Sequence, residues 1–199
     1  MAFPGAGDVM DRCPKWFDGD HKLCDIDHMI SDTPKLRLAQ DRDFDAMWPM
    51  LRDMIRAGDT YAIDPQLSRD AMFDLWMQGP RATFVAELDG EVAGTYYIKT
   101  NQQGGGAHVC NCGYVVAASA RGRGLARAMC RHSQDEARGL GYLAMQFNCV
   151  VETNAGAIAL WESEGFETVG ILPRVFDHPE AGLVNARVMI KWLVTGAPD

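Results

Sequence analysis

The chain has 199 residues, of which 47% are hydrophobic and 23% are charged, a composition typical of one globular domain and too apolar for a disordered chain. The 27 acidic and 19 basic side chains leave a formal net charge of −8, which disfavours nucleic acid as the main partner because a polyanion would be repelled. The six cysteines are scattered without CxxC spacing, which excludes a disulfide scaffold. No apolar run approaches the roughly 18 residues of a membrane span, and the N-terminus has no apolar leader region, so we expect a soluble, cytoplasmic protein.

Residues 1–35 are predicted to be an irregular N-terminal arm, and residues 36–199 a single domain. The arm is rich in proline and aspartate and shows neither a helical nor a strand period. Four of its side chains could be written as zinc ligands, but their spacing matches no zinc pattern: Cys13, His21, Cys24 and His28. We therefore expect no metal site.

From Leu36 onward the turn residues divide the chain into regular elements. In chain order we expect a strand at 36–39, helices from Asp43 to Gly58 and from Ser68 to Gly79, strands at 82–88, 92–98 and 108–116, a helix at 124–138, a strand at 143–151, a helix at 155–164, a short strand after Gly165 and a long strand at 185–193. Asp89-Gly90 favours a tight antiparallel hairpin, whereas a helix joins the strands at 108–116 and 143–151. The predicted fold class is α/β, with a mixed, mostly antiparallel central sheet and helices on both faces.

The segment 115–126 leads from a strand through a loop with two glycines directly into a helix. Such a helix start presents unpaired N–H groups and the positive end of the helix dipole, which together bind anions. Gly122 and Gly124 allow the backbone to approach an anion closely. Arg121, Arg123 and Arg127 lie where the dipole disfavours cations, so a multiply charged anion would account for them. The alternative is a glycine-rich helix start with solvated arginines.

Arg121-x-x-Gly124-x-Ala126, followed by Asn154, Trp161 and Glu164-Gly165-Phe166, resembles the GCN5-related N-acetyltransferase superfamily over roughly residues 36–193. The resemblance implies acetyl-CoA as co-substrate, with its pantetheine arm in an opening between the strands at 108–116 and 143–151, and a homodimer, which is frequent in the family. It assigns coenzyme contacts to Val115, Val116, Arg121, Gly122, Arg123, Gly124, Leu125, Ala126, Asn154 and Trp161. Asn154 is equally well explained as a helix N-cap.

Acetyl transfer needs hydrogen-bond donors for the developing oxyanion and a group that protonates or stabilises the departing thiolate. Two departures from the family pattern bear on this chemistry. The strand at 108–116 carries no carboxylate where many members place a glutamate base, and Trp161 stands where the family often has a tyrosine. Because an indole can donate a hydrogen bond but cannot act as an acid, the source of the proton is left unassigned.

The segments 108–111, 145–148 and 172–179 resemble more closely the fungal branch that N-acetylates proline analogues such as azetidine-2-carboxylate. This resemblance implies that Asn111 holds the acceptor carboxylate and that Asn148 supports the thioester or thiolate. The alternative is that both amides satisfy strand backbone or each other. Tyr61 in the early loop and Phe176 in the late one are candidates for the acceptor pocket, because such loops carry specificity.

The sequence thus predicts an N-acetyltransferase that moves acetyl from acetyl-CoA to a small primary or secondary amine by direct attack. An amino acid or a proline analogue is the expected acceptor. Two alternatives stay open: a protein or peptide N-acetyltransferase, and a non-catalytic acyl-CoA-binding module, which the missing glutamate and tyrosine motivate. We expect neither a nucleic-acid nor a membrane partner.

Overall fold

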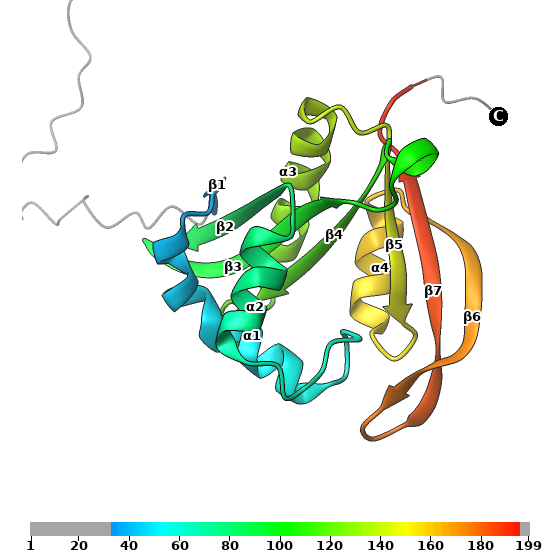
Figure 1. Ribbon diagram of the computed structural model, residues 1–199, viewed down its shortest axis with the longest axis horizontal. Helices are drawn as coiled ribbons and strands as arrows, with labels where there is room; N and C mark the ends of the chain where they lie inside the picture. The colour runs from blue at the N-terminus through cyan, green and yellow to red at the C-terminus, as the bar shows by residue number, and fades with distance from the viewer. Residues whose placement is uncertain (1–32, 196–199) are drawn as a thin grey trace, which may run out of the picture. The chain divides into compact units, whose positions relative to one another are not determined.

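The structure is a computed structural model that describes residues 33–195 (Figure 1). Within these residues the chain forms a seven-stranded sheet in the order β1-β2-β3-β4-β5-β7-β6. The strands are β1 (Lys35–Leu38), β2 (Ala82–Leu88), β3 (Glu91–Thr100), β4 (Val109–Val116), β5 (Ala144–Val151), β6 (Glu167–His178) and β7 (Gly182–Trp192). The helices are α1 (Phe44–Ala57), α2 (Arg69–Phe73), α3 (Leu125–Gly139) and α4 (Ala155–Ser163).

Only β4 and β5 pair in parallel among the described strands, and every other neighbouring pair is antiparallel. This arrangement confirms the predicted mixed, mostly antiparallel sheet. β1 begins at Lys35, one residue inside the predicted arm, and the four candidate zinc ligands lie outside the described residues. No helix within residues 33–195 combines the length and the apolar character needed to cross a bilayer.

Helices cover both faces of the sheet, so the molecule has a helix–sheet–helix layering (Figure 1). Phe84, Tyr96 and Cys112 pack with α3 and α4, whereas their neighbours Val85 and Tyr97 pack with α1 and α2. Successive residues of a strand point to opposite faces, so the two apolar cores lie on opposite sides of the same strands. The central strands β2, β3 and β4 are buried on both faces for this reason.

Local turn chemistry sets most of the element ends. α1 stops at Gly58, whose φ of 62° is left-handed, as expected for a helix that ends on glycine. The Ser68 side chain accepts a hydrogen bond from the amide of Ala71 and caps α2. Asp89 and Gly90 both have positive φ, which confirms the tight hairpin between β2 and β3.

The second helix differs from the continuous helix that the sequence predicts between Ser68 and Gly79. After α2 the chain widens into a π-helical turn over Asp74–Gln78. Trp76 is fully buried there, and its indole donates to Thr95 Oγ1 at 3.1 Å while its carbonyl accepts from Thr83 Oγ1 at 2.6 Å. Residue 80 is proline and has no N–H, so the Trp76 carbonyl has no donor four residues on and accepts from the sheet instead.

The expectation of a short strand after Gly165 is wrong, because β6 runs for 12 residues along β7. β6 is one of the two edge strands of the sheet, and apolar side chains such as Val169, Ile171 and Val175 stay exposed on it. Its pairing with β7 is interrupted by two register shifts. Without a buried face or a regular ladder, β6 has no alternating pattern that the sequence could display.

Candidate functional site

The start of α3 is open and uncapped. Its N-cap is Gly124, which has a φ of 76° and makes no side-chain hydrogen bond to the helix. Gly122 has the same φ, and nothing lies within 4 Å of the place where a Cβ of either glycine would be. The first-turn amides therefore face open space rather than a capping side chain, as an anion-binding helix start requires.

The arginines near this helix start differ in their partners. Arg123 Nη1 lies 3.2 Å from Asp89 Oδ2, and Arg127 pairs with Glu164. Arg121 is exposed and lines the cavity described below. Because carboxylates of the chain itself neutralise Arg123 and Arg127, the argument that all three cations need a bound anion does not hold. The expectation of an anion then depends on the glycines, the amides and Arg121.

Glu164 joins the end of α4 to α3. Its buried carboxylate receives Arg127 and also Arg131, whose Nε is 2.9 Å from Oε2. Burial alone would raise the pKa of this carboxyl, but the hydrogen bonds from Arg131 and Arg127 outweigh burial and hold the pKa below its usual value. Glu164 is therefore ionised in the folded protein at neutral pH and fixes the start of α3 against α4.

Replacing Glu164 by glutamine is expected to lower the free energy of unfolding at neutral pH by about 2 kcal/mol, because charge-assisted hydrogen bonds are lost at a buried position. The pKa of Glu164 is lowered by folding, so its contribution is full above the ordinary carboxyl pKa and is lost as pH falls through the folded value. Urea unfolding at pH 7 and pH 3 measures this. The matched control is Glu162→Gln, which removes a half-exposed carboxylate from the same helix. An equal loss in both variants, or a loss that persists unchanged in acid, would contradict the prediction.

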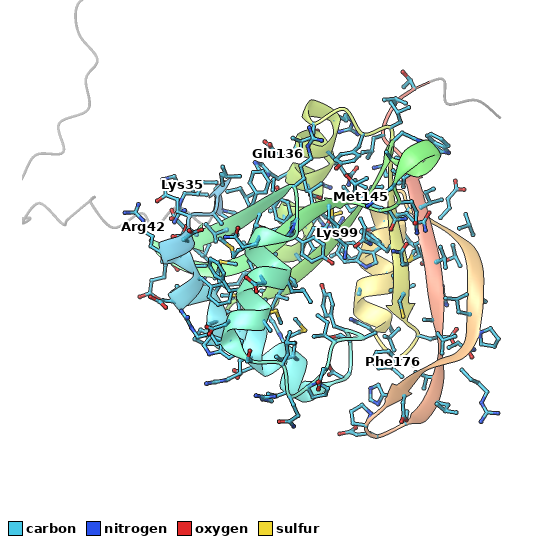
Figure 2. All side chains as sticks on the ribbon, in the orientation of Figure 1. Lys35, Arg42, Lys99, Glu136, Met145 and Phe176 are labelled. Atoms are coloured by element: carbon cyan, nitrogen blue, oxygen red, sulfur yellow. The ribbon has the colours of Figure 1, made fainter. Side chains whose placement is uncertain are left out.

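β4 and β5 pair over only two positions and then part. The pairs are Val109 with Ala144 and Cys110 with Met145. Beyond them the two strands diverge toward their carboxyl ends, as Figure 1 shows; Met145, at the last paired position, is labelled in Figure 2. The opening between β4 and β5 that the family resemblance implies is therefore present. Beyond Met145, the backbone N–H and C=O groups of the two strands that face this opening do not bond to each other.

A network of amide side chains lies where β4 and β5 separate. Asn111 Nδ2 donates to the Gln146 carbonyl at 2.8 Å, and Gln146 Nε2 donates to Asn148 Oδ1 at 2.8 Å. Asn148 Nδ2 in turn donates to Asn101 Oδ1 at 2.7 Å. The structure thus brings the two predicted asparagines into one network through Gln146. These contacts also agree with the alternative that both amides satisfy backbone and each other.

Tyr61, from the loop between α1 and α2, reaches the open edge of β4. Its hydroxyl accepts a hydrogen bond from the Tyr114 amide at 2.7 Å and donates one to the Tyr114 carbonyl at 3.0 Å. Burial raises the pKa of the Tyr61 phenol well above its usual value, so the hydroxyl keeps its proton and can donate.

A cavity of about 540 Å³ opens beside these groups, a volume within the usual range for small-ligand sites. It lies among α1, the loop after it, the end of β4, the loop after β5 and the end of β6. Its lining residues are Met50, Asp53, Met54, Ala57, Asp59, Thr60, Tyr61, Tyr114, Val115, Val116, Ala118, Arg121, Thr153, Asn154 and His178. The approach to α3, the end of β4, the loop after α1 and the end of β6 therefore meet at one place. Gly122, Gly124, Asn111 and Asn148 lie outside this lining.

The predicted residues divide between this cavity and its surroundings. Asn154 does two things at once, because it lines the cavity and its Oδ1 accepts from the Ala157 amide at 3.2 Å to cap α4. Trp161 does not line the cavity; it is 8% exposed and packs on Tyr114 and Phe147 in the core. Phe176, labelled in Figure 2, is also buried and lies two residues before His178.

Several cavity residues were not singled out by the sequence. Met50 and Met54 follow the helical period of α1 and indicate only a core-facing side. Asp53, Asp59 and Thr153 carry no motif at all. Asn101, the outer member of the amide network, belongs to a connection between strands, and nothing in its spacing indicates that it meets Asn148.

Comparison with known proteins places these features in a family context. A family model described as the acetyltransferase (GNAT) family matches residues 48–166. The N-acetyltransferase aca1 of Schizosaccharomyces pombe is 30% identical over 134 residues, which are 59% of this chain and 64% of that protein. The chain thus spans just under two thirds of this curated relative.

Solved structures share the fold over nearly their whole length. A GCN5-related N-acetyltransferase from Kribbella flavida has a TM-score of 0.77 and 44% identity, and the match covers 80% of this chain and 97% of that one. The ribosomal-protein-alanine N-acetyltransferase from Brucella melitensis has a TM-score of 0.70 and 25% identity, covering 79% of this chain and 99% of that one.

Proposed function

The chain belongs to the acetyltransferase (GNAT) family, and from this premise we propose that it transfers acetyl from acetyl-CoA to the nitrogen of a small primary or secondary amine. The observation that carries the proposal is the junction of three features at one cavity. These are the uncapped start of α3, the gap between β4 and β5, and the loop that follows α1.

The residues of the α3 start fit the diphosphate of acetyl-CoA. The main-chain amides of residues 121–126 would hold its oxygens, and the open space around Gly122 and Gly124 would admit them. Leu125 is buried, so its contribution would come from the backbone. Val115, Val116 and Asn154 line the adjoining cavity, where the pantetheine arm would lie, and the buried Trp161 would support the wall behind it.

Acetyl-CoA supplies an activated thioester when bound, and the chain supplies polar groups around it. β4 presents backbone N–H groups at an edge that β5 has left, and such fixed donors stabilise charge that develops on a carbonyl oxygen. Asn148 would assist the reacting centre by hydrogen bonding, and Asn111 would hold the acceptor. Both belong to the amide network that lies where β4 and β5 separate. The amine would attack the thioester directly, without an acyl-enzyme intermediate.

The cavity volume of about 540 Å³ is typical of small-ligand sites and supports a small acceptor. An amino acid or a proline analogue is the proposed acceptor, and the similarity to an N-acetyltransferase of Schizosaccharomyces pombe supports the fungal branch. A protein N-terminus is the second candidate. The name of the Brucella melitensis relative, a ribosomal-protein-alanine N-acetyltransferase, favours it.

Release of free thiol from acetyl-CoA tests the proposal. We expect release that depends on an added amine, with the largest rates among small amino acids and cyclic imino acids such as azetidine-2-carboxylate. Peptides with a free N-terminus form the comparison group. Preference for the peptides would transfer the assignment to the second candidate, and coenzyme binding without acceptor-dependent release would indicate a non-catalytic acyl-CoA-binding module.

Two further predictions concern the state of the protein in the cell. We infer a homodimer in a cytoplasmic location, as the family resemblance implies. Light scattering on the purified protein should give twice the chain mass of 21.9 kDa. A mass of one chain across the micromolar range would contradict the dimer.

A further inference from the structure

The hydroxyl of Tyr61 forms hydrogen bonds with two backbone groups of β4 that a ligand could otherwise bond. It accepts from the Tyr114 N–H at 2.7 Å and donates to the Tyr114 C=O at 3.0 Å. One side-chain atom thus completes both hydrogen bonds of one residue, as a neighbouring strand would.

The two Tyr114 groups point into the gap between β4 and β5. In an antiparallel pair, a residue directs its N–H and its C=O to the same side, and successive residues alternate. Val109 and Ala117 bond toward the β3 side, through Asn101 and Ala93 respectively. Tyr114 has the opposite parity, so its groups face away from β3, and β5 no longer pairs with β4 at this position.

We propose that Tyr61 is a placeholder for the acyl arm of the coenzyme: its hydroxyl occupies the Tyr114 N–H and C=O until a carbonyl and an amide of the arm take them. The inference rests on the proposed function, which places that arm in the same gap. A ligand carbonyl can accept from the N–H and a ligand amide can donate to the C=O, so the exchange leaves both Tyr114 groups paired. The arm and the Tyr61 hydroxyl therefore compete for one position.

The surroundings of Tyr61 suit such an exchange. The residue belongs to the loop that joins α1 to α2, and it lines the cavity. Its ring meets Trp76 edge to face, with centroids 6.2 Å apart, so the hydroxyl can leave β4 while the base of the ring keeps an aromatic partner. Because the same loop lines the cavity that would also take the acceptor, coenzyme binding would change the shape of the acceptor pocket.

Removal of the hydroxyl tests the competition. In Tyr61→Phe the free protein loses both hydrogen bonds to Tyr114, whereas the coenzyme-bound protein does not need them. We expect the dissociation constant of acetyl-CoA, measured by calorimetry, to fall about tenfold, which is about 1.4 kcal/mol, and the thermal midpoint of the free protein to fall as well. ADP carries a diphosphate without the acyl arm, so its affinity should be the same in wild type and variant.

Tyr142→Phe is the matched control. Tyr142 is also buried, and its hydroxyl bonds Thr100 Oγ1 at 2.7 Å, away from the cavity. This variant should lose stability without any change in acetyl-CoA affinity. If Tyr61→Phe binds acetyl-CoA as wild type does, or more weakly, Tyr61 is not a placeholder. If wild type and both variants all fail to bind acetyl-CoA, the proposed function itself fails.

The wild-type protein offers a second measurement that does not depend on a variant. Hydrogen exchange of the peptide that covers residues 58–67 should become faster when acetyl-CoA is added, because the coenzyme removes the loop from β4. ADP should leave this exchange unchanged. Slower exchange with acetyl-CoA than with ADP would overturn the proposal.

Discussion

Replacing Gly124 by valine is expected to weaken acetyl-CoA binding by at least about a hundredfold, which is about 2.8 kcal/mol. Gly124 has a φ of 76°, a region in which a β-branched residue is strained. To relieve that strain the loop must rotate, and the amides of the first α3 turn then lose their common direction. The added methyl groups also enter the open space in front of the helix start. Calorimetry with acetyl-CoA measures the loss.

Gly141→Val is the control for this prediction. Gly141 has a φ of 87° and open space around it, but it follows α3 rather than preceding it. Both variants should lose a comparable amount of stability through the same backbone strain, and only Gly124→Val should lose affinity for acetyl-CoA. Acetyl-CoA affinity within twofold of wild type in Gly124→Val would remove the main support for the proposed function.

Truncating Asn148 to alanine is expected to lower turnover by about a hundredfold, the effect typical of losing a hydrogen bond that acts on the reacting centre. The dissociation constant of acetyl-CoA should stay within about twofold of wild type, since the substitution leaves the glycine turn before α3 untouched. Steady-state kinetics combined with calorimetry separates the two quantities. A merely structural amide would instead change stability and leave turnover nearly intact.

Asn101→Ala is the control variant for Asn148→Ala. It removes the outer partner of Asn148 and leaves the Asn148 side chain and its bond from Gln146 in place. We expect a loss of turnover of a few fold, because Asn148 is then held less firmly. If the two variants lose turnover equally, Asn148 acts only through the packing of the network and is not a catalytic residue.

Local chemistry made several elements predictable from the sequence. Gly58 and Asp89-Gly90 end their elements because left-handed φ values are accessible to glycine and aspartate at low cost. Ser68 caps a helix for an equally local reason. The turn before α3 was recognisable in the same way, since Gly122 and Gly124 adopt the positive φ that their residue type favours.

The β6 strand and the π turn could not be read from the sequence. The length of β6 depends on how far β7 accompanies it, and an exposed edge strand leaves no alternating pattern. The turn over Asp74–Gln78 depends on Thr83 and Thr95, which belong to strands later in the chain.

By itself, the sequence determined the fold class, the family and the residues of the helix start, because turns, caps and periodicity act over a few neighbouring residues. Only the tertiary structure decided that Glu164 neutralises Arg127, that Gln146 links Asn111 to Asn148, and that Tyr61 completes the edge of β4. Each of these contacts, apart from the one between Gln146 and Asn148, joins residues that lie tens of positions apart along the chain. Their meeting depends on how the strands and helices pack in three dimensions, which the spacing of residues along the chain does not encode.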